Sequence, residues 1–140
     1  MAGLPVEQLP AAEPLTIRMI SNVAKQFEVK SKFQEWYPEM ASDVPKGQEK
    51  HILPYQSKVL LLFQKIEGMD VVIFAAYLQE YGANCPEPNR RRVYLSYLDS
   101  VKFFRPNIQT AKGESLRTMV YQEVLCGYLD FVKRQGYVHM

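Results

Sequence analysis

The sequence lacks most of what marks secreted, membrane-spanning or strongly charged proteins. Its 140 residues contain only two cysteines, without CxxC spacing, and no N-terminal signal peptide, so we expect reduced thiols and no disulfide. No apolar run approaches the roughly 18 to 20 residues that a membrane-spanning helix needs, so we expect no membrane partner. The 17 basic and 15 acidic side chains nearly cancel, which predicts no electrostatic attraction to nucleic acid.

Motifs of several enzyme classes are also missing. There is no P-loop, GxGxxG or GxSxG motif and no cluster with metal-ligand spacing, so we expect no metal site. We reject a Cys/His dyad because His51 and His139 have no visible acidic orienter, Cys85 lies in a Pro-rich loop, and Cys126 is expected near the buried face of a helix. What is present, 47% hydrophobic and 12% aromatic residues, suffices for one globular core.

The first third of the chain gives few firm indications of secondary structure. Residues 1–15 contain three prolines among small and acidic residues, so we expect a flexible lead-in. Residues 16–29 fit a helix or a strand, and the pattern does not decide between them. Residues 43–54 gather proline, glycine and charged side chains and predict a surface connection.

Two apolar runs, residues 57–66 and 71–80, are rich in β-branched and aromatic side chains and predict a β-hairpin joined by residues 67–70. Because the centres of both runs are continuously apolar, we expect central strands that helices cover on both faces. Residues 91–97 predict a third strand with Val93 and Leu95 on one face. Together with the helix described next, these strands indicate an α/β or α+β layer.

Residues 115–135 predict an amphipathic helix, which ends at Gly136. Apolar side chains recur there at intervals of three and four residues, at Leu116, Met119, Val120, Val124, Tyr128 and Val132. Arg117 lies in the first turn, where free backbone N–H groups and the helix dipole favour a bound anion. The alternative is an exposed arginine without a special contact. The run from Arg90 to Arg92 indicates the solvated start of the third strand.

Three segments carry a resemblance to a known family: PYQSKVLLLFQKIEGMDV, QEYGANCPEPNRRRVYLSYLDSVKFFRP and GESLRTMVYQEVLCGYLDFVKRQGY. The string YLSYLDSVKFFRP at positions 94–106 is too long and too unusual for chance agreement. From residue 27 to residue 138 the chain resembles the catalytic domain of histone acetyltransferases of the CREB-binding-protein class, and its TAKGES segment resembles the plant-type branch. The resemblance implies that residues 16–140 are the N-terminal part of this domain, an incomplete acetyltransferase fold with a central mixed β-sheet and packed helices.

The resemblance also implies a nuclear, monomeric enzyme that transfers an acetyl group from acetyl-CoA to lysines of histone tails and other proteins. Carried over position by position, the residues along the pantetheine and acetyl end of the coenzyme are Leu98, Asp99 and Ser100, where we expect irregular backbone to bind the pantetheine amides. The phosphate contacts are Arg117, through its guanidinium fork, and Thr118, through its hydroxyl and N–H. Tyr97 and Asp99 border the position of the substrate lysine.

No catalytic residue is expected within the chain. In the family that it resembles, a tyrosine of a Trp-Tyr pair protonates the departing thiolate, and we expect this tyrosine beyond Met140. We interpret Trp36 and Tyr37 as residues that pack structurally and match the catalytic Trp-Tyr pair in identity only, because they precede the hairpin and Pro38 follows them. Three hypotheses stay open: a partial acetyltransferase domain without turnover on its own, a non-catalytic fragment that binds CoA or a peptide, and a fragment that does not fold stably.

Overall fold

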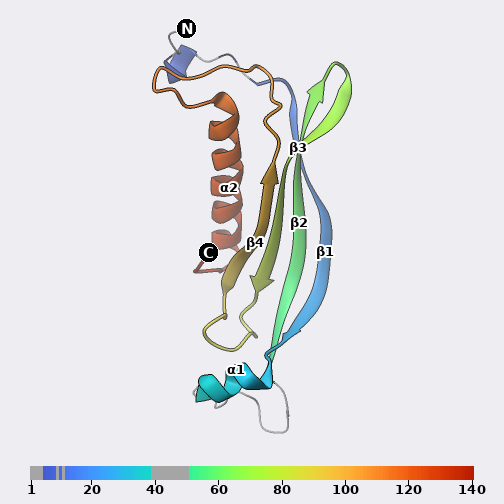
Figure 1. Ribbon diagram of the computed structural model, residues 1–140, viewed down its shortest axis with the longest axis vertical. Coiled ribbons are helices and arrows are strands. Elements are labelled where there is room, and N and C mark those ends of the chain that lie inside the picture. The colour runs from blue at the N-terminus through green and yellow to red at the C-terminus, as the bar shows by residue number, and fades with distance from the viewer. Residues whose placement is uncertain (1–4, 9, 11, 39–50) are drawn as a thin grey trace.

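Four strands and one long helix make up most of the described chain (Figure 1). The computed structural model describes residues 5–8, 10, 12–38 and 51–140. In chain order the elements are η1 (Val6–Gln8), β1 (Leu15–Glu28), α1 (Ser31–Trp36), β2 (Ile52–Ile66), β3 (Met69–Tyr81), β4 (Arg92–Ser100) and α2 (Leu116–Arg134). None of these helices has the length and apolar character needed to cross a membrane.

The strands form one sheet in the order β1-β2-β3-β4, and all three strand pairs are antiparallel. A sheet packed by a helix confirms the predicted α/β class. The undecided residues 16–29 prove to be strand β1, and the third predicted strand extends to Ser100. Within the described residues, the one parallel pairing is the isolated bridge between Arg92, at the start of β4, and His139, after α2.

Two predicted segments fall partly on residues 1–4, 9, 11 and 39–50, which lie outside the described part of the chain. The flexible lead-in over residues 1–15 therefore stays a prediction. Near its end, the Pro14 carbonyl accepts the Lys65 N–H at 3.0 Å. The predicted connection over residues 43–54 is too long, because β2 already begins at Ile52.

β2 and β3 form the predicted hairpin, with a tighter turn than expected. Only Glu67 and Gly68 lie between the strands, and their φ angles are both positive, at 51° and 83°. Two successive residues with positive φ are typical of a type I′ turn, whose twist matches that of the flanking strands. Glycine adopts this conformation without steric strain.

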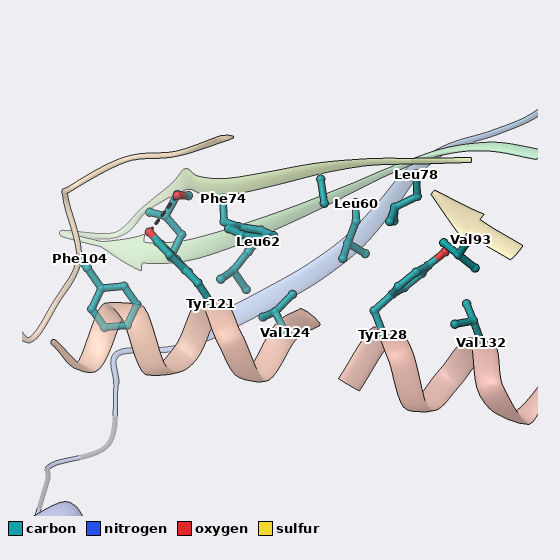
Figure 2. Packing of buried hydrophobic residues seen from close by; sticks show 12 residues of the cluster. Leu60, Leu62, Phe74, Leu78, Val93, Phe104, Tyr121, Val124, Tyr128 and Val132 are labelled. Atoms are coloured by element: carbon teal, nitrogen blue, oxygen red, sulfur yellow. Dashed lines mark hydrogen bonds between the residues drawn. The ribbon is translucent and has the colours of Figure 1, made fainter. Parts of the chain in front are cut away.

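The hydrophobic core lies between α2 and one face of the sheet (Figure 2). Alternate residues of β2 point toward the helix, and in β3 the alternation shifts at a bulge where Ile73 and Phe74 are both buried. The core comprises Leu60, Leu62, Ile73, Phe74, Ala76, Leu78, Val93, Phe104, Tyr121, Val124, Tyr128 and Val132. Full burial of one large apolar side chain contributes roughly 1.5 to 3 kcal/mol, so this layer accounts for much of the stability.

The opposite face of the sheet, called the open face below, stays accessible in the described chain. Val72 and Tyr77 on this face are 42% and 44% exposed. The prediction that β2 and β3 are covered on both faces is therefore wrong for the described residues. Although the apolar runs are continuous, burial still alternates along β2, where Leu60 and Leu62 are buried and Leu61 between them is not.

Candidate functional site

The first turn of α2 holds the predicted phosphate contacts and is capped by a serine. The Ser115 hydroxyl accepts the Thr118 backbone N–H at 3.2 Å and lies 2.8 Å from the Thr118 hydroxyl. Serine is a preferred N-cap because its oxygen satisfies such an N–H group. The prediction that Thr118 offers a free N–H is wrong, since the cap uses that group. Its hydroxyl remains as the polar group for a ligand.

Arg117 is the half-buried cation of the same turn. The Leu116 N–H donates to the Ile108 carbonyl at 3.1 Å, whereas the Arg117 N–H has no acceptor among the described residues. The first turn contains no acidic side chain, and Arg117 makes no ion pair with a described carboxylate. A cation is unfavourable at the positive end of the helix dipole, so an anion bound there would stabilise the turn.

α2 begins at the end of the molecule where β4 finishes (Figure 1). One turn after Arg117, the Tyr121 hydroxyl donates to the carbonyls of Ile73 at 2.9 Å and Val101 at 3.2 Å (Figure 2 draws the first bond). Burial raises the pKa of Tyr121, and the positive charge of Arg117 opposes that increase. The predicted phosphate contacts therefore lie at the same corner as the residues that end β4.

Leu98, Asp99 and Ser100 are regular strand residues, which corrects the prediction of irregular backbone. They pair in turn with Ala76, Ala75 and Phe74 of β3. Because β4 is last in the strand order, its outer edge over these three residues has no partner strand in the described chain. An unpaired strand edge presents N–H and C=O groups that another extended chain can bind.

A β-bulge at Ser96 determines which way the following side chains point. Leu95 pairs with Leu78 and Tyr97 pairs with Tyr77, so Ser96 is an extra residue without a partner. Its hydroxyl donates to the Tyr77 carbonyl at 3.0 Å. The extra residue shifts the alternation of β4 by one position, since successive strand residues point to opposite faces.

After the bulge, Leu98 and Ser100 lie on the α2 face, because cross-strand partners share a face and their partners Ala76 and Phe74 are buried under α2. This is the face on which the helix of Arg117 packs. The structure therefore places both side chains on the face toward α2, at the end of β4 near which α2 begins (Figure 1).

The two predicted peptide contacts lie on the open face. The Tyr97 ring meets the Tyr77 ring edge-on, with centroids 5.7 Å apart and an interplanar angle of 74°. Asp99 shares this face, and its Oδ1 accepts the Ser100 N–H at 2.8 Å. The structure therefore separates the side chain of Asp99 from those of its neighbours Leu98 and Ser100.

The sequence reasoning missed two residues that hold this corner, Gln64 and Tyr121. Gln64 is completely buried, and its amide bonds to the backbone of Arg105, in the connection between β4 and α2. Tyr121 carried a usable signal, because it precedes Val124 by three residues and Tyr128 by seven on the predicted apolar stripe. Gln64 carried none, since its partner is 41 residues away in sequence.

The two cysteines differ in their surroundings. Burial, with a smaller effect from the charge of Glu87, raises the pKa of Cys85 to about 11, so this thiol is largely protonated at neutral pH. Cys126 is exposed, which corrects the expectation that it lies near the buried face of the helix. The described residues contain no group of three or more histidine, cysteine or carboxylate side chains that could hold a metal ion.

Trp36 and Tyr37 lie far from the corner described above. They end α1, which is at the opposite end of the sheet from the start of α2 (Figure 1). The Tyr37 ring packs on Phe33 with centroids 4.7 Å apart, whereas Trp36 is 66% exposed. In the basic run, Arg90 pairs with Glu87 at 2.7 Å on the surface.

A buried carboxylate lies at the centre of a polar network near the other end of α2. Glu80 pairs with Lys58 at 2.6 Å and accepts the Tyr128 hydroxyl, while the Tyr137 hydroxyl lies 3.4 Å away. Burial raises the pKa of Tyr128, and the hydrogen bond and charge of Glu80 raise it further. These groups connect β2, β3 and α2 with the segment after the helix.

The sequence is similar to histone acetyltransferases. The family "Histone acetyltransferase domain KAT3" matches residues 6–140. The chain is 49% identical over 137 residues to the probable histone acetyltransferase HAC-like 3 of Oryza sativa subsp. japonica and 51% identical over 135 residues to histone acetyltransferase HAC12 of Arabidopsis thaliana. It is 42% identical over 124 residues to the protein cbp-1 of Caenorhabditis elegans. These matches cover 98%, 96% and 89% of the chain but only 10%, 8% and 6% of the relatives.

Proposed function

This chain belongs to the family of KAT3 histone acetyltransferase domains, and from that premise we propose that it forms the acetyl-CoA-binding part of a histone lysine acetyltransferase. The observation that carries the proposal is the corner at which β4 finishes and α2 begins, where the Tyr121 hydroxyl bonds to the carbonyl of Val101, the residue after β4. It combines a cation, an unused N–H group and a free strand edge, which suit a ligand with phosphates at one end and amides at the other.

In this proposal, Arg117 binds the phosphates of CoA. Its planar fork of donors matches phosphate oxygens, and no described carboxylate competes for it. The Arg117 N–H and the Thr118 hydroxyl supply further donors in the same turn. The bound anion would remove the unfavourable interaction between the arginine and the helix dipole.

The pantetheine arm then runs along the outer edge of β4. Leu98 provides an apolar contact, Ser100 a hydroxyl, and the backbone between them the hydrogen-bonding groups of an extended strand. Asp99 contributes to this contact through its backbone, because its side chain points to the open face.

Acetyl transfer requires a neutral lysine amine to attack the thioester carbonyl carbon; the C–S bond breaks, the amine loses a proton and the thiolate gains one. Holding both reactants in the attack geometry removes much of the barrier. We assign the holding of the coenzyme to this chain, with its acetyl end at the outer edge of β4, where the lysine-bearing segment that Tyr97 and Asp99 border approaches it from the open face. The substrates are histone tails and other lysine-bearing proteins in the nucleus.

For the 140 residues on their own we propose binding without turnover. The proton donor of the family that this sequence resembles is a tyrosine of a Trp-Tyr pair, and Trp36 is the one tryptophan in the sequence. Tyr37 is not placed to protonate a thiolate at the corner, because it lies at the other end of the sheet (Figure 1). Acetylation of a histone-tail peptide by the purified 140-residue protein would contradict this part of the proposal.

Titration of the purified protein with CoA tests the binding role. We expect Arg117→Ala to weaken CoA binding by about tenfold or more, and added salt to weaken the wild type more than the variant. Arg134→Ala is the matched control, since Arg134 is an exposed arginine at the far end of the same helix. Identical titration curves for the wild type and Arg117→Ala would exclude the assignment.

The alternative function is a non-catalytic module that binds CoA or a peptide. Its binding curves would look the same, so the longer protein that contains this chain has to be assayed. For an acetyltransferase, Arg117→Ala lowers kcat/KM in the longer protein, whereas Tyr37→Phe leaves it unchanged. Unchanged kcat/KM in Arg117→Ala, combined with weakened CoA binding, favours the non-catalytic module.

A further inference from the structure

A buried glutamine links β2 to the connection that precedes α2. The Gln64 amide oxygen accepts the Arg105 N–H at 2.9 Å, and the amide nitrogen donates to the Arg105 carbonyl at 2.6 Å. A neighbouring strand would supply the same donor and acceptor from its backbone. One side chain therefore acts as the strand partner of Arg105.

Between Leu60 and Ile66, Gln64 is the one polar side chain on its face of β2. Leu60, Leu62 and Ile66 lie on the same face of β2, and all three are buried with Gln64. A buried amide without partners is unfavourable by roughly 1 to 3 kcal/mol, so an apolar residue would suit this position if filling space were its only role. Both bonds of Gln64 go to the β4–α2 connection, which indicates that holding the connection is its role.

The connection, residues 101–115, is tied to the sheet at few points. In its second half, the bonds are local: the Thr110 N–H donates to the Glu114 carbonyl at 2.8 Å, and the Glu114 N–H donates to the Thr110 hydroxyl at 3.1 Å. These bonds shape the segment but do not fix it relative to the strands. In its first half, the Val101 N–H donates to the Ile73 carbonyl of β3 at 3.0 Å, and Phe104 packs on Tyr121 with centroids 6.2 Å apart. Arg105 bonds to Gln64, and its carbonyl also accepts the Glu13 N–H at 3.4 Å.

We propose that Gln64 is a positioning residue for the coenzyme, which fixes the first turn of α2 relative to the end of β4. Through Arg105 it sets where Arg117 stands with respect to Leu98 and Ser100, so that phosphates and pantetheine arm are bound at the same time. The inference rests on the proposed CoA-binding function. The ion pair between Arg105 and Glu67 at 2.8 Å contributes little to this, because both side chains are exposed.

A double-mutant cycle tests the proposal. Gln64→Met keeps the length of the side chain and removes both hydrogen bonds, and CoA affinity is measured for the wild type, Gln64→Met, Arg117→Ala and the double variant. We expect Gln64→Met to weaken CoA binding by about tenfold. It should add little to the effect of Arg117→Ala, because both changes remove the same contact between the guanidinium and the phosphates. The salt dependence of CoA binding should also decrease in Gln64→Met, which loss of stability alone does not produce.

The control is Gln122→Met, which makes the same change on the exposed side of α2. Additive effects of Gln64→Met and Arg117→Ala, or unchanged affinity in Gln64→Met, would overturn the positioning role. The circular-dichroism spectrum of each variant shows whether it is folded at the temperature of the titration.

Hydrogen exchange keeps the inference testable if Gln64→Met does not fold or the wild type does not bind CoA. In the wild type, the Arg105 N–H should exchange about as slowly as the core amides of β3, because its acceptor is buried. Rapid exchange there would overturn the role of Gln64 without any variant. If the Arg105 N–H is protected but CoA does not bind, the proposed function is contradicted. The contact between Gln64 and Arg105 is then still supported.

Discussion

The Tyr121 hydroxyl lies 3.2 Å from the Val101 carbonyl oxygen and so ties the first half of α2 to the residue that follows β4. The same hydroxyl lies 2.9 Å from the Ile73 carbonyl in β3. A hydroxyl has one proton to donate, so the two carbonyls share it. The hydroxyl of Tyr121 thus connects α2 with β3 and with the residue after β4.

Tyr121→Phe should lower the free energy of unfolding by about 1 to 3 kcal/mol, because two carbonyls lose their common donor in a largely buried place. The ring contacts with Phe74 and Phe104 remain, so the change reports on the hydroxyl. Urea unfolding followed by circular dichroism measures the difference. An unchanged midpoint and slope would show that the hydroxyl does not connect the two layers.

The two faces of β4 lead to a prediction about ligand footprints. In nuclear magnetic resonance titrations of the wild type, CoA should shift the side-chain signals of Leu98 and the amide signals of the first turn of α2. A lysine-rich histone-tail peptide should instead shift the ring signals of Tyr97 and Tyr77, because an aromatic face attracts a cation. Shifts of the Tyr97 and Tyr77 ring signals on addition of CoA would contradict the separation of side chains that the bulge at Ser96 produces.

The sequence predicts α2 well because its signals are local. Ser115 caps the first turn, and Gly136, with a φ of 91°, follows the last one, so both ends depend on residues that lie inside the segment itself. The hairpin is predictable for the same reason, since Glu67 and Gly68 form a tight turn between two apolar runs. In contrast, β1 is an edge strand with exposed apolar side chains such as Ile17 and Val23, so its pattern does not alternate between buried and exposed.

The candidate site is predictable only in part, because several of its features depend on pairing between distant segments. Arg117 follows from the start of the helix and from the family resemblance. The direction of Leu98 and Ser100 depends on the register between β3 and β4, where the bulge at Ser96 reverses the alternation. Likewise, the contact of Gln64 with Arg105 joins residues 41 positions apart, which no local pattern indicates.

The buried hydroxyls and the Cys85 thiol predict a loss of stability at alkaline pH. Burial raises the pKa of Tyr81, Tyr121, Tyr128 and Tyr137 above their usual 10.0, and it raises that of Cys85 from 9.0 to about 11. Above pH 9 the unfolded chain therefore loses protons that the folded chain keeps, so the free energy of unfolding falls as pH rises. At neutral pH the folded and unfolded chains both hold these protons, so the stability that is lost at alkaline pH is fully present.

Urea unfolding at a series of pH values measures this dependence. Between its pKa in the unfolded chain and its raised pKa in the folded chain, one tyrosine contributes a slope of at most about 1.4 kcal/mol per pH unit, so Tyr128→Phe should make the decrease shallower. Tyr94→Phe is the control, because Tyr94 is exposed on β4. A stability that stays constant between pH 8 and pH 11 would show that these hydroxyls are not buried in solution.

The ion pair of Lys58 and Glu80 gives the largest expected change in stability. Lys58→Met leaves the Glu80 carboxylate buried without its cation and should lower the free energy of unfolding by about 3 to 5 kcal/mol. Adding Glu80→Gln to this variant removes the unpaired charge while keeping an acceptor for Tyr128, so the double variant should be more stable than Lys58→Met alone. Lys65→Met makes the same substitution at an exposed position of β2 and should change stability by less than about 1 kcal/mol. Equal unfolding midpoints for Lys58→Met and Lys65→Met in guanidinium chloride would mean that Glu80 does not hold its charge inside the folded protein.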